Sequence, residues 1–369
     1  MNFRWLRRLL RRDWRWWLGL KPAFLAYPVP RRTISVVIPA YNEEKSIAQT
    51  VTSIRNQSVT IDEIIVVDDC SSDRTSEVAL QAGARVVRTA VNQGTKAMAQ
   101  NYVLSQITTE LVVTIDGDTI LHPDAIARTL PYLNDPKCAS VCGFVVPQQI
   151  KSIWERGRFV EYLFGISVFK AAQNHVQAVL VSSGCFSTFR TKALRILGGF
   201  KQRTMAEDMD FTWEATLKGY TVYCAPDAYC YPLDPQTAQV FINQVDRWSR
   251  SFFQNITIHR NGFRKNKKLA AFIFGYLVEG LLSPLVIPAL LFAALRDFPV
   301  ALLLTLATEF AIVGICSLWA GARRGMFWVT LASLPAYFVI KPVNFWLFWR
   351  SLYKEWIIGE RLTQWHKGH

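Results

Sequence analysis

Two aspartates separated by one glycine follow a short apolar run, residues 111–115. Side chains two apart on a strand point to the same side, so Asp116 and Asp118 can face one site while Gly117 lets the backbone turn close to a ligand. Carboxylate oxygens suit Mg²⁺ or Mn²⁺, which commonly bridges one or two carboxylates to substrate phosphates. The sequence therefore predicts a divalent-cation site that holds a pyrophosphate. A solvated turn after a core strand is the alternative interpretation.

Further carboxylates stand at places where an apolar run ends or a helical pattern begins. Asp68 and Asp69 close the run that starts at Glu63, and Glu207 and Asp208 precede a helical pattern over 211–218. Carboxylates at such places also cap helices, so helix capping is the structural alternative for both pairs.

The elements that must position these carboxylates alternate between short strands and helices. A helix is predicted from Asn42 to about Gln57, and another contains Lys96 and Asn101. Crossover spacing between strands implies a parallel sheet flanked by helices, in which ligands bind beyond the carboxyl ends of the strands. The predicted strands are 34–39, 63–69, 85–88 and 111–115.

Charge and composition separate the chain into a central domain and membrane-active ends. The 369 residues carry a formal net charge of +14, with 13 tryptophans beside the arginines, which points to a membrane surface and away from nucleic acid. The seven cysteines show no CxxC pair and no metal-ligand spacing. They are expected to be reduced thiols in a domain that faces the cytosol.

The first 30 residues are predicted to form an amphipathic membrane-interface helix and a linker. Six arginines between Arg4 and Arg15 gather on one side, and tryptophans and leucines occupy the other. An amphipathic helix packed on its own domain is the alternative.

Apolar residues dominate the region 263–350, which is predicted to hold transmembrane helices. The ionisable residues inside them are expected to face a bundle interior, a polysaccharide path or the interface. Three full crossings conflict with the basic tail at 351–369, which favours the cytosol, so one segment is expected not to cross completely. The three segments are about 269–295, 299–320 and 326–349, with Glu279, Glu309 and Lys341 inside them.

Several motifs in fixed order resemble a known family. VVIPAYNEE, IIVVDDCSSD, NQGTKAMAQN and TIDGDT resemble the nucleotide-binding half of family-2 glycosyltransferases. Residues 181–187 resemble the acceptor-side segment, 205–210 the Thr-Glu-Asp box, and 244–248 the Gln-x-x-Arg-Trp motif of the membrane-bound processive branch. That branch makes cellulose, chitin, hyaluronan and poly-N-acetylglucosamine. The resemblance implies a GT-A fold, Rossmann-like with a mainly parallel sheet, over residues 31–262, with interfacial helices near 150–172 and 236–258.

On the donor side, the resemblance implies that Asp118 ligates Mg²⁺ or Mn²⁺. Asp116 is assigned to the metal or to the donor ribose. Asp69 would contact the nucleotide base with Asp68 beside it, and Lys96 would lie near the uracil or the phosphate.

The resemblance makes Asp208 the general base, with Glu207 beside it. A base must reach the attacking hydroxyl on the sugar face opposite the leaving group, so the anomeric centre is inverted and an alpha-linked donor gives a beta linkage. Acceptor contacts are assigned to Ser183, Gly184 and Cys185.

The Gln-x-x-Arg-Trp residues fall three and four apart, so one helical face presents Gln244, Arg247 and Trp248 together. Arg247 can reach the diphosphate and Trp248 offers a flat face for the acceptor sugar. A membrane-interface helix with Arg247 and Trp248 as anchors is the alternative.

The chain departs from the family pattern at Cys70, where glycine is usual, and at Thr95, which interrupts a Gly-Lys pair.

The sequence predicts a multi-pass protein of the inner (cytoplasmic) membrane that extends a beta-linked polysaccharide from a UDP-sugar, with UDP-N-acetylglucosamine as the leading donor. Membrane lipids and accessory or identical subunits are the expected partners, and 351–369 resembles a gating segment. One alternative is transfer of a single sugar to a polyprenyl phosphate or another lipid. An inactive relative that serves as a membrane receptor or assembly subunit is the other.

Overall fold

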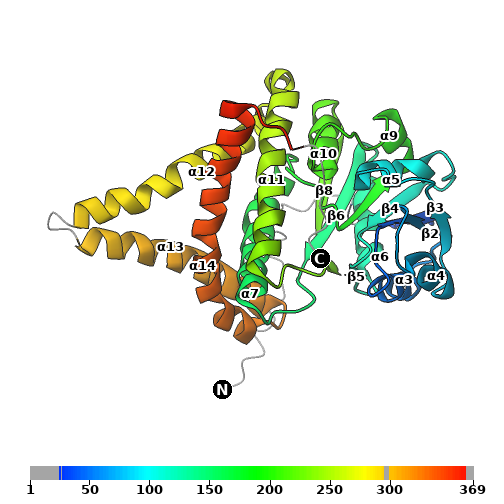
Figure 1. Ribbon diagram of the computed structural model, residues 1–369, viewed down its shortest axis with the longest axis horizontal. Coiled ribbons are helices and arrows are strands. Elements are labelled where there is room, and N and C mark those ends of the chain that lie inside the picture. Colours follow the sequence, from blue (N-terminus) through cyan, green and yellow to red (C-terminus); the bar gives the residue numbers. More distant parts are fainter. Residues whose placement is uncertain (1–24, 26, 295–298, 363–369) are drawn as a thin grey trace.

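The computed structural model describes residues 25, 27–294 and 299–362. Figure 1 shows a sheet domain on one side, the helices α12 to α14 on the other, and α7 and α11 between them. The predicted interface helix at 1–30 and the last residues of the tail fall largely outside the described residues.

Within the described residues, eight strands form one sheet in the order β3-β2-β1-β4-β7-β6-β8-β5. The first four pair in parallel, whereas β7 is antiparallel to β4 and to β6, β5 is antiparallel to β8, and β6 and β8 are parallel. The prediction of a mainly parallel sheet therefore holds for the amino-terminal half only, and the sheet as a whole is mixed. The strands are β1 (Ile34–Ala40), β2 (Glu63–Asp68), β3 (Arg85–Arg88), β4 (Leu111–Ile115), β5 (Ile120–Leu121), β6 (Cys138–Val145), β7 (Phe186–Arg190) and β8 (Thr221–Tyr231).

The central strands read as continuous apolar runs because both faces of the sheet are covered. On β1, Val36 and Ile38 belong to one buried cluster and Val37 to another, as the two-residue period of a strand requires. The helices of the sheet domain are α3 (Ile47–Arg55), α4 (Thr75–Gln81), α5 (Lys96–Leu104), α6 (Ala125–Thr129), α8 (Ala171–His175), α9 (Thr191–Ile196) and α10 (Glu207–Leu217).

The helix predicted to start at Asn42 begins only at Ile47. The amides of Asn42, Glu43 and Glu44 donate to side chains of the loop after β2, at 3.0, 2.7 and 3.1 Å, which keeps this stretch non-helical. The start of α10 was also predicted wrongly. This helix begins at Glu207 and not at Phe211. The carboxylates of the Glu-Asp pair consequently lie in its first turn.

Three long helices follow the sheet domain at the predicted positions: α12 (Lys267–Ala294), α13 (Pro299–Arg323) and α14 (Phe327–Leu352). Among the described residues, one helix is long and apolar enough to cross a membrane, Phe327–Ile358, with 32 residues and a mean hydropathy of 1.3. The three-segment topology stays a prediction.

Helices α7 (Ile153–Phe164) and α11 (Ala238–His259) lie where the two interfacial helices are predicted, and both pack against α14. A Cβ on Gly157 would lie 2.8 Å from Ile340 and 2.9 Å from the carbonyl oxygen of Ala336, so α7 approaches α14 too closely for any side chain there. The sheet domain and α14 are thereby joined through one helical layer (Figure 1).

Candidate active site

The Asp-Gly-Asp turn follows the carboxyl end of β4 and is held by hydrogen bonds to its backbone. The amide of Asp116 donates to the carbonyl of Cys185 at 3.3 Å, and the carbonyl oxygens of Gly117 and Asp118 accept from Thr50 at 2.9 Å and Gln148 at 2.5 Å. These hydrogen bonds use backbone atoms, and both carboxylates are half-exposed at the carboxyl end of β4. Two half-exposed carboxylates in one turn fit the hard-oxygen preference of Mg²⁺ or Mn²⁺.

Lys96 is the first residue of α5, and its side chain extends to the Asp-Gly-Asp turn. Its Nζ lies 2.5 Å from an Asp116 oxygen and 3.7 Å from a Glu207 oxygen, and it donates to the carbonyl of Gly184 at 2.8 Å. Burial lowers the pKa of this ammonium, but the carboxylates of Asp116 and Glu207 outweigh burial and raise the pKa above its ordinary value. Lys96 is therefore a permanent cation beside the predicted metal site.

The same residue, Gly184, also holds the predicted base. Its amide donates to Asp208 Oδ2 at 2.8 Å, and the amide of Met209 donates to the other oxygen at 2.8 Å. A Cβ on Gly184 would lie 3.0 Å from Asp208 and 3.1 Å from Lys96 Nζ. One residue, Gly184, thus lies between the Lys96 ammonium and the Asp208 carboxylate, and a side chain there would make tight contacts with both.

Glu207 lies beside Asp208, and its side chain is 12% exposed. Burial raises the pKa of Glu207, which the ammonium of Lys96 offsets only in part. The two neighbouring carboxylates thus differ in surroundings, because Glu207 lies near the Lys96 ammonium whereas Asp208 is held by two backbone amides.

Asp68 and Asp69 meet different neighbours. Asp68 is fully buried, and its oxygens accept from Arg88 at 2.7 Å, from the Ser71 amide at 2.9 Å and from Ser76. These contacts agree with the structural interpretation of Asp68 as a residue that holds the loop and the start of α4.

Asp69 is 6% exposed, and one of its oxygens accepts from the Gln93 amide at 2.8 Å and from Thr89 at 3.0 Å. It ties the loop that leads into α5 to the end of β2. The two departures from the family pattern flank this loop: Cys70 has a positive φ of 62°, and Thr95 caps α5 by accepting from the Met98 amide.

The Gln-x-x-Arg-Trp residues do not all face the same neighbours. Arg247 donates to the carbonyl of Met205, two residues before Glu207, at 3.3 Å, whereas Gln244 and Trp248 face α7. The Met205 amide in turn donates to Gln254 of α11 at 3.3 Å. Helix α11 thus holds the segment before Asp208 by hydrogen bonds to both the carbonyl and the amide of Met205.

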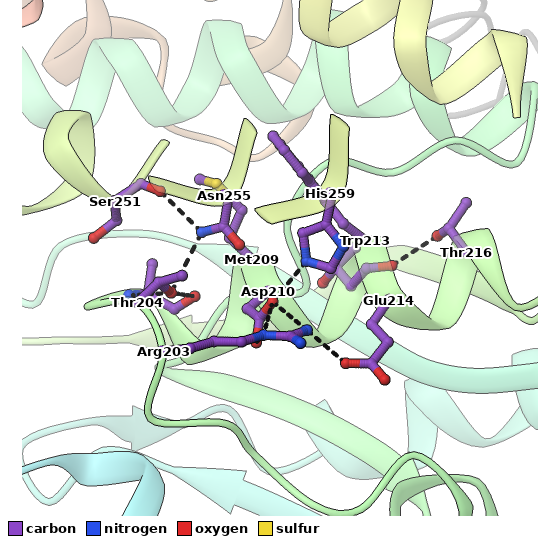
Figure 2. Close-up of polar contacts among 12 residues, drawn as sticks. Arg203, Thr204, Met209, Asp210, Trp213, Glu214, Thr216, Ser251, Asn255 and His259 are labelled. Carbon is purple, nitrogen blue, oxygen red and sulfur yellow. Dashed lines mark hydrogen bonds and ion pairs between the residues drawn. The ribbon is translucent and has the colours of Figure 1, made fainter. Parts of the chain in front are cut away.

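Asp210, two positions after Asp208, has a separate network that Figure 2 shows. It is fully buried, and its oxygens contact Arg203 at 2.8 Å and His259 Nε2 at 2.6 Å, while Arg203 also pairs with Glu214 at 2.6 Å. This network joins α10 to the end of α11. Neither Arg203 nor His259 belongs to a recognisable motif, so sequence reasoning did not find them.

Lys170 is a further residue that sequence reasoning missed. It ends the π-helical segment Gly165–Lys170, and its Nζ donates to Ser183 at 3.1 Å in the acceptor segment. The π-helical turn is the feature that places it there, and such turns are frequent at functional sites. No pattern in the sequence marks this turn.

Nowhere in the part of the chain that the structure describes do three or more His, Cys, Asp or Glu side chains form a group able to hold a metal ion by themselves. A cation at Asp116 and Asp118 would need further oxygen ligands from a phosphate or from water, which is how Mg²⁺ is commonly held.

The fold is GT-A-like. A mannosyltransferase from Pyrobaculum calidifontis, solved in complex with GDP-Man and Mn²⁺, superposes with a TM-score of 0.62 over 92% of this chain and 95% of its own, at 23% identity.

Residues 35–198 match the Glycosyl transferase family 2 model, which agrees with the resemblance found in the sequence. Among curated relatives, the poly-beta-1,6-N-acetyl-D-glucosamine synthase of Staphylococcus epidermidis is 29% identical over 245 residues, 65% of this chain and 59% of the relative. The synthase of the same name from Staphylococcus aureus strain COL is 29% identical over 222 residues, 59% of this chain and 54% of the relative. The chain therefore spans between one half and two thirds of the length of these relatives.

Proposed function

We propose that this protein is a membrane-bound inverting glycosyltransferase that adds sugars from a UDP-sugar to a growing beta-linked polysaccharide. UDP-N-acetylglucosamine is the leading donor, because the similar staphylococcal enzymes are synthases of an N-acetylglucosamine polymer. The observation that carries the proposal is that Gly184 binds both Lys96, assigned to the donor side, through its carbonyl and Asp208, assigned to the acceptor side, through its amide.

On the donor side, Asp118 and Asp116 would hold a divalent cation, as in the similar mannosyltransferase with its Mn²⁺. Such a cation supplies charge for the departing diphosphate. Lys96 and Arg247 place two fixed positive charges on this side of the site, where the leaving group gains negative charge in the transition state. Asp69 sits at the adjoining loop, suited to contact the nucleotide base.

On the acceptor side, Asp208 would accept the proton of the attacking hydroxyl. Its two backbone hydrogen bonds hold the carboxylate in a fixed orientation, which a general base requires. Attack from the side of Asp208 and departure on the side of Lys96 invert the anomeric centre. Ser183, Gly184 and Cys185 would line the acceptor path, with Trp248 providing a stacking face.

The helices beyond residue 263 would anchor the catalytic domain to the cytosolic face of the membrane. Support comes from α14, the described helix able to cross a bilayer, and from exposed Trp346, Trp349 and Trp356 beside Arg350 and Lys354. Tryptophan with Arg and Lys near a helix end is typical of a membrane interface. Lipids, the polysaccharide acceptor and further subunits would then be the partners.

The test is UDP release from the purified protein in detergent with Mg²⁺ or Mn²⁺, one UDP-sugar at a time, with the product sized. A long product made from one donor, and lost on chelation of the metal, is expected. One added sugar would move the assignment to the lipid-acceptor transferase, and no UDP release from any donor would favour the receptor or assembly subunit.

A further inference from the structure

A buried arginine on α7 contacts the Gln-x-x-Arg-Trp helix. The Arg158 side chain is 2% exposed, and its Nη2 donates to Gln244 Oε1 at 3.2 Å. Its guanidinium carbon lies 4.8 Å from the ring centre of Trp248 and 4.6 Å from that of Phe241. One cation therefore contacts two of the three motif residues at once.

Burying a guanidinium is costly unless it is paired and hydrogen-bonded. Arg158 is paired with Glu161 of the same helix at 2.6 Å, while its Nε has no hydrogen-bond partner among the described residues. An apolar side chain would fill this space between α7 and α11 at lower cost. Packing therefore does not explain the buried guanidinium of Arg158 well, and orientation of neighbouring side chains explains it better.

The geometry indicates what is oriented. Gln244 and Trp248 are four residues apart on one face of α11, and Arg158 contacts both, which fixes the rotation of that face toward α7. The planar fork of arginine can hydrogen-bond the amide and stack on the indole together, which lysine cannot do. With one face of the indole against the guanidinium, the ring plane of Trp248 is set.

The network extends to α14. Glu161, the partner of Arg158, accepts a hydrogen bond from Asn344 of α14 at 3.3 Å. The Trp248 ring is thus connected through Arg158 and Glu161 of α7 to Asn344 of the apolar helix α14.

We propose that Arg158 is a positioning residue for acceptor binding, which acts by holding Gln244 and the Trp248 ring in the orientation on which an acceptor sugar stacks. The proposal rests on the glycosyltransferase function proposed above. Arg158 itself contacts neither sugar nor donor, so donor binding does not depend on it.

The test compares Arg158→Lys with Arg156→Lys, a control two residues away whose guanidinium reaches only the backbone carbonyls of Lys151 and Ala332. With a short beta-linked N-acetylglucosamine oligosaccharide as acceptor, Arg158→Lys should raise the acceptor KM about five- to tenfold, the size expected for a lost cation–π contact. The UDP dissociation constant and the slow UDP release without acceptor should not change. Arg156→Lys should match the unaltered protein.

A double-mutant cycle separates positioning from general destabilisation. In a Trp248→Ala background, Arg158→Lys should raise the acceptor KM no further, because its effect passes through the ring. An equal rise in both backgrounds, or an unchanged acceptor KM in folded Arg158→Lys, would overturn the proposal.

If Arg158→Lys does not fold, Gln244→Met gives the second measurement. It leaves the Arg158–Glu161 pair intact and removes one orienting hydrogen bond, so the acceptor KM should rise; an unchanged value would contradict the proposal. Absence of UDP release from the unaltered protein would instead count against the glycosyltransferase function itself, so the two failures are distinguishable.

Discussion

Asp208 and Asp210 are two positions apart in one short helix, yet they have different surroundings. Asp208 is half-exposed and bound by two backbone amides, whereas Asp210 is fully buried between Arg203 and His259. The first is available for chemistry and the second joins two helices. Substitution of each to asparagine should therefore give two different phenotypes.

Asp208→Asn should lower transfer by about a hundred- to ten-thousandfold, the usual contribution of a general base, with UDP binding nearly unchanged. The measurement is UDP release with acceptor, alongside UDP affinity. Asp210→Asn is the matched comparison: it removes the buried carboxylate that joins Arg203 to His259 and leaves Arg203 paired with Glu214 alone, so the melting temperature should fall. Equal melting temperatures for the two variants would contradict this division of roles.

Cys70 adopts a left-handed backbone with a φ of 62°, at the position where the family usually has glycine. A residue with a Cβ pays roughly 1–2 kcal/mol for this conformation, while glycine costs about 0.4–1 kcal/mol through the unfolded chain. Cys70→Gly should therefore raise the free energy of unfolding by up to about 1 kcal/mol. Chemical denaturation checks this, with Cys70→Ala, which keeps the strain, expected to give no gain.

Sequence reasoning at this scale found the residues that converge, because motif spacing reflects the ends of neighbouring strands. Asp116, Lys96, Gly184 and Asp208 are all within one network of contacts. It could not find Arg158 or Lys170, since these approach from helices whose packing depends on residues far away in the chain. It also could not tell that Asp68 is fully buried, because the same residue pattern serves capping and ligand binding.

Helix α11 is the element on which the others meet. It packs against α7, α10 and α14, and its 22 residues also carry the contacts to the C-terminal segment, Tyr353–Leu362. Arg250 of α11 is 4% exposed and lies 2.7 Å from Glu355, which is 3% exposed. Gln254, which holds the Met205 amide, also donates to Glu355 at 3.1 Å.

Arg250→Met should destabilise the protein by about 3–5 kcal/mol, because it leaves Glu355 as a buried charge without its partner. The exposed pair Lys354–Glu360 on the same segment offers the control, and Lys354→Met should cost within about 1 kcal/mol. Thermal or denaturant unfolding in detergent measures both. A small, similar loss for the two variants would mean that the C-terminal segment is not docked as described.

Periodicity and length predicted the existence of these helices well, and their boundaries less well. The start of α10 was placed too late because its first turn is rich in carboxylates that also suit a loop. The start of α3 was placed too early because the side chains that hold Asn42 to Glu44 come from a loop some 30 residues further on. Such tertiary contacts are invisible to local pattern.

At the scale of the whole molecule, a buried carboxylate lies between the sheet domain and the helical layer. Asp234 follows β8, is 3% exposed and accepts a hydrogen bond from Tyr162 of α7 at 3.1 Å. Burial raises the pKa of Asp234 to about 7, against the opposing influence of Arg158. The folded protein therefore keeps a proton on Asp234 that the unfolded chain has already lost.

The free energy of unfolding should consequently decline as pH rises from about 4 to about 7, since the folded state binds the extra proton over that range. Asp234→Asn removes this group and should flatten the pH dependence, whereas Asp227→Asn on the exposed part of β8 should not. Melting temperatures between pH 5 and 8 test the prediction. Parallel curves for all three proteins would show that Asp234 does not titrate in this range.

The overall architecture was predicted in its first half only. Alternating strands and crossover helices define a parallel sheet, but nothing local indicates that β7 runs antiparallel to β4 or that β6 and β8 pair in parallel across a long connection. These pairings are decided by which apolar faces remain to be covered once the first half has formed.

The position of Gly184 has a consequence for protein engineering. Its carbonyl binds a residue from the first half of the sheet domain and its amide binds one from the second, and a side chain at this position would make tight contacts with both. The two halves are therefore not exchangeable modules. A chimera with a relative of different sugar preference should retain activity only when Lys96, the turn at 183–185 and Asp208 come from one parent.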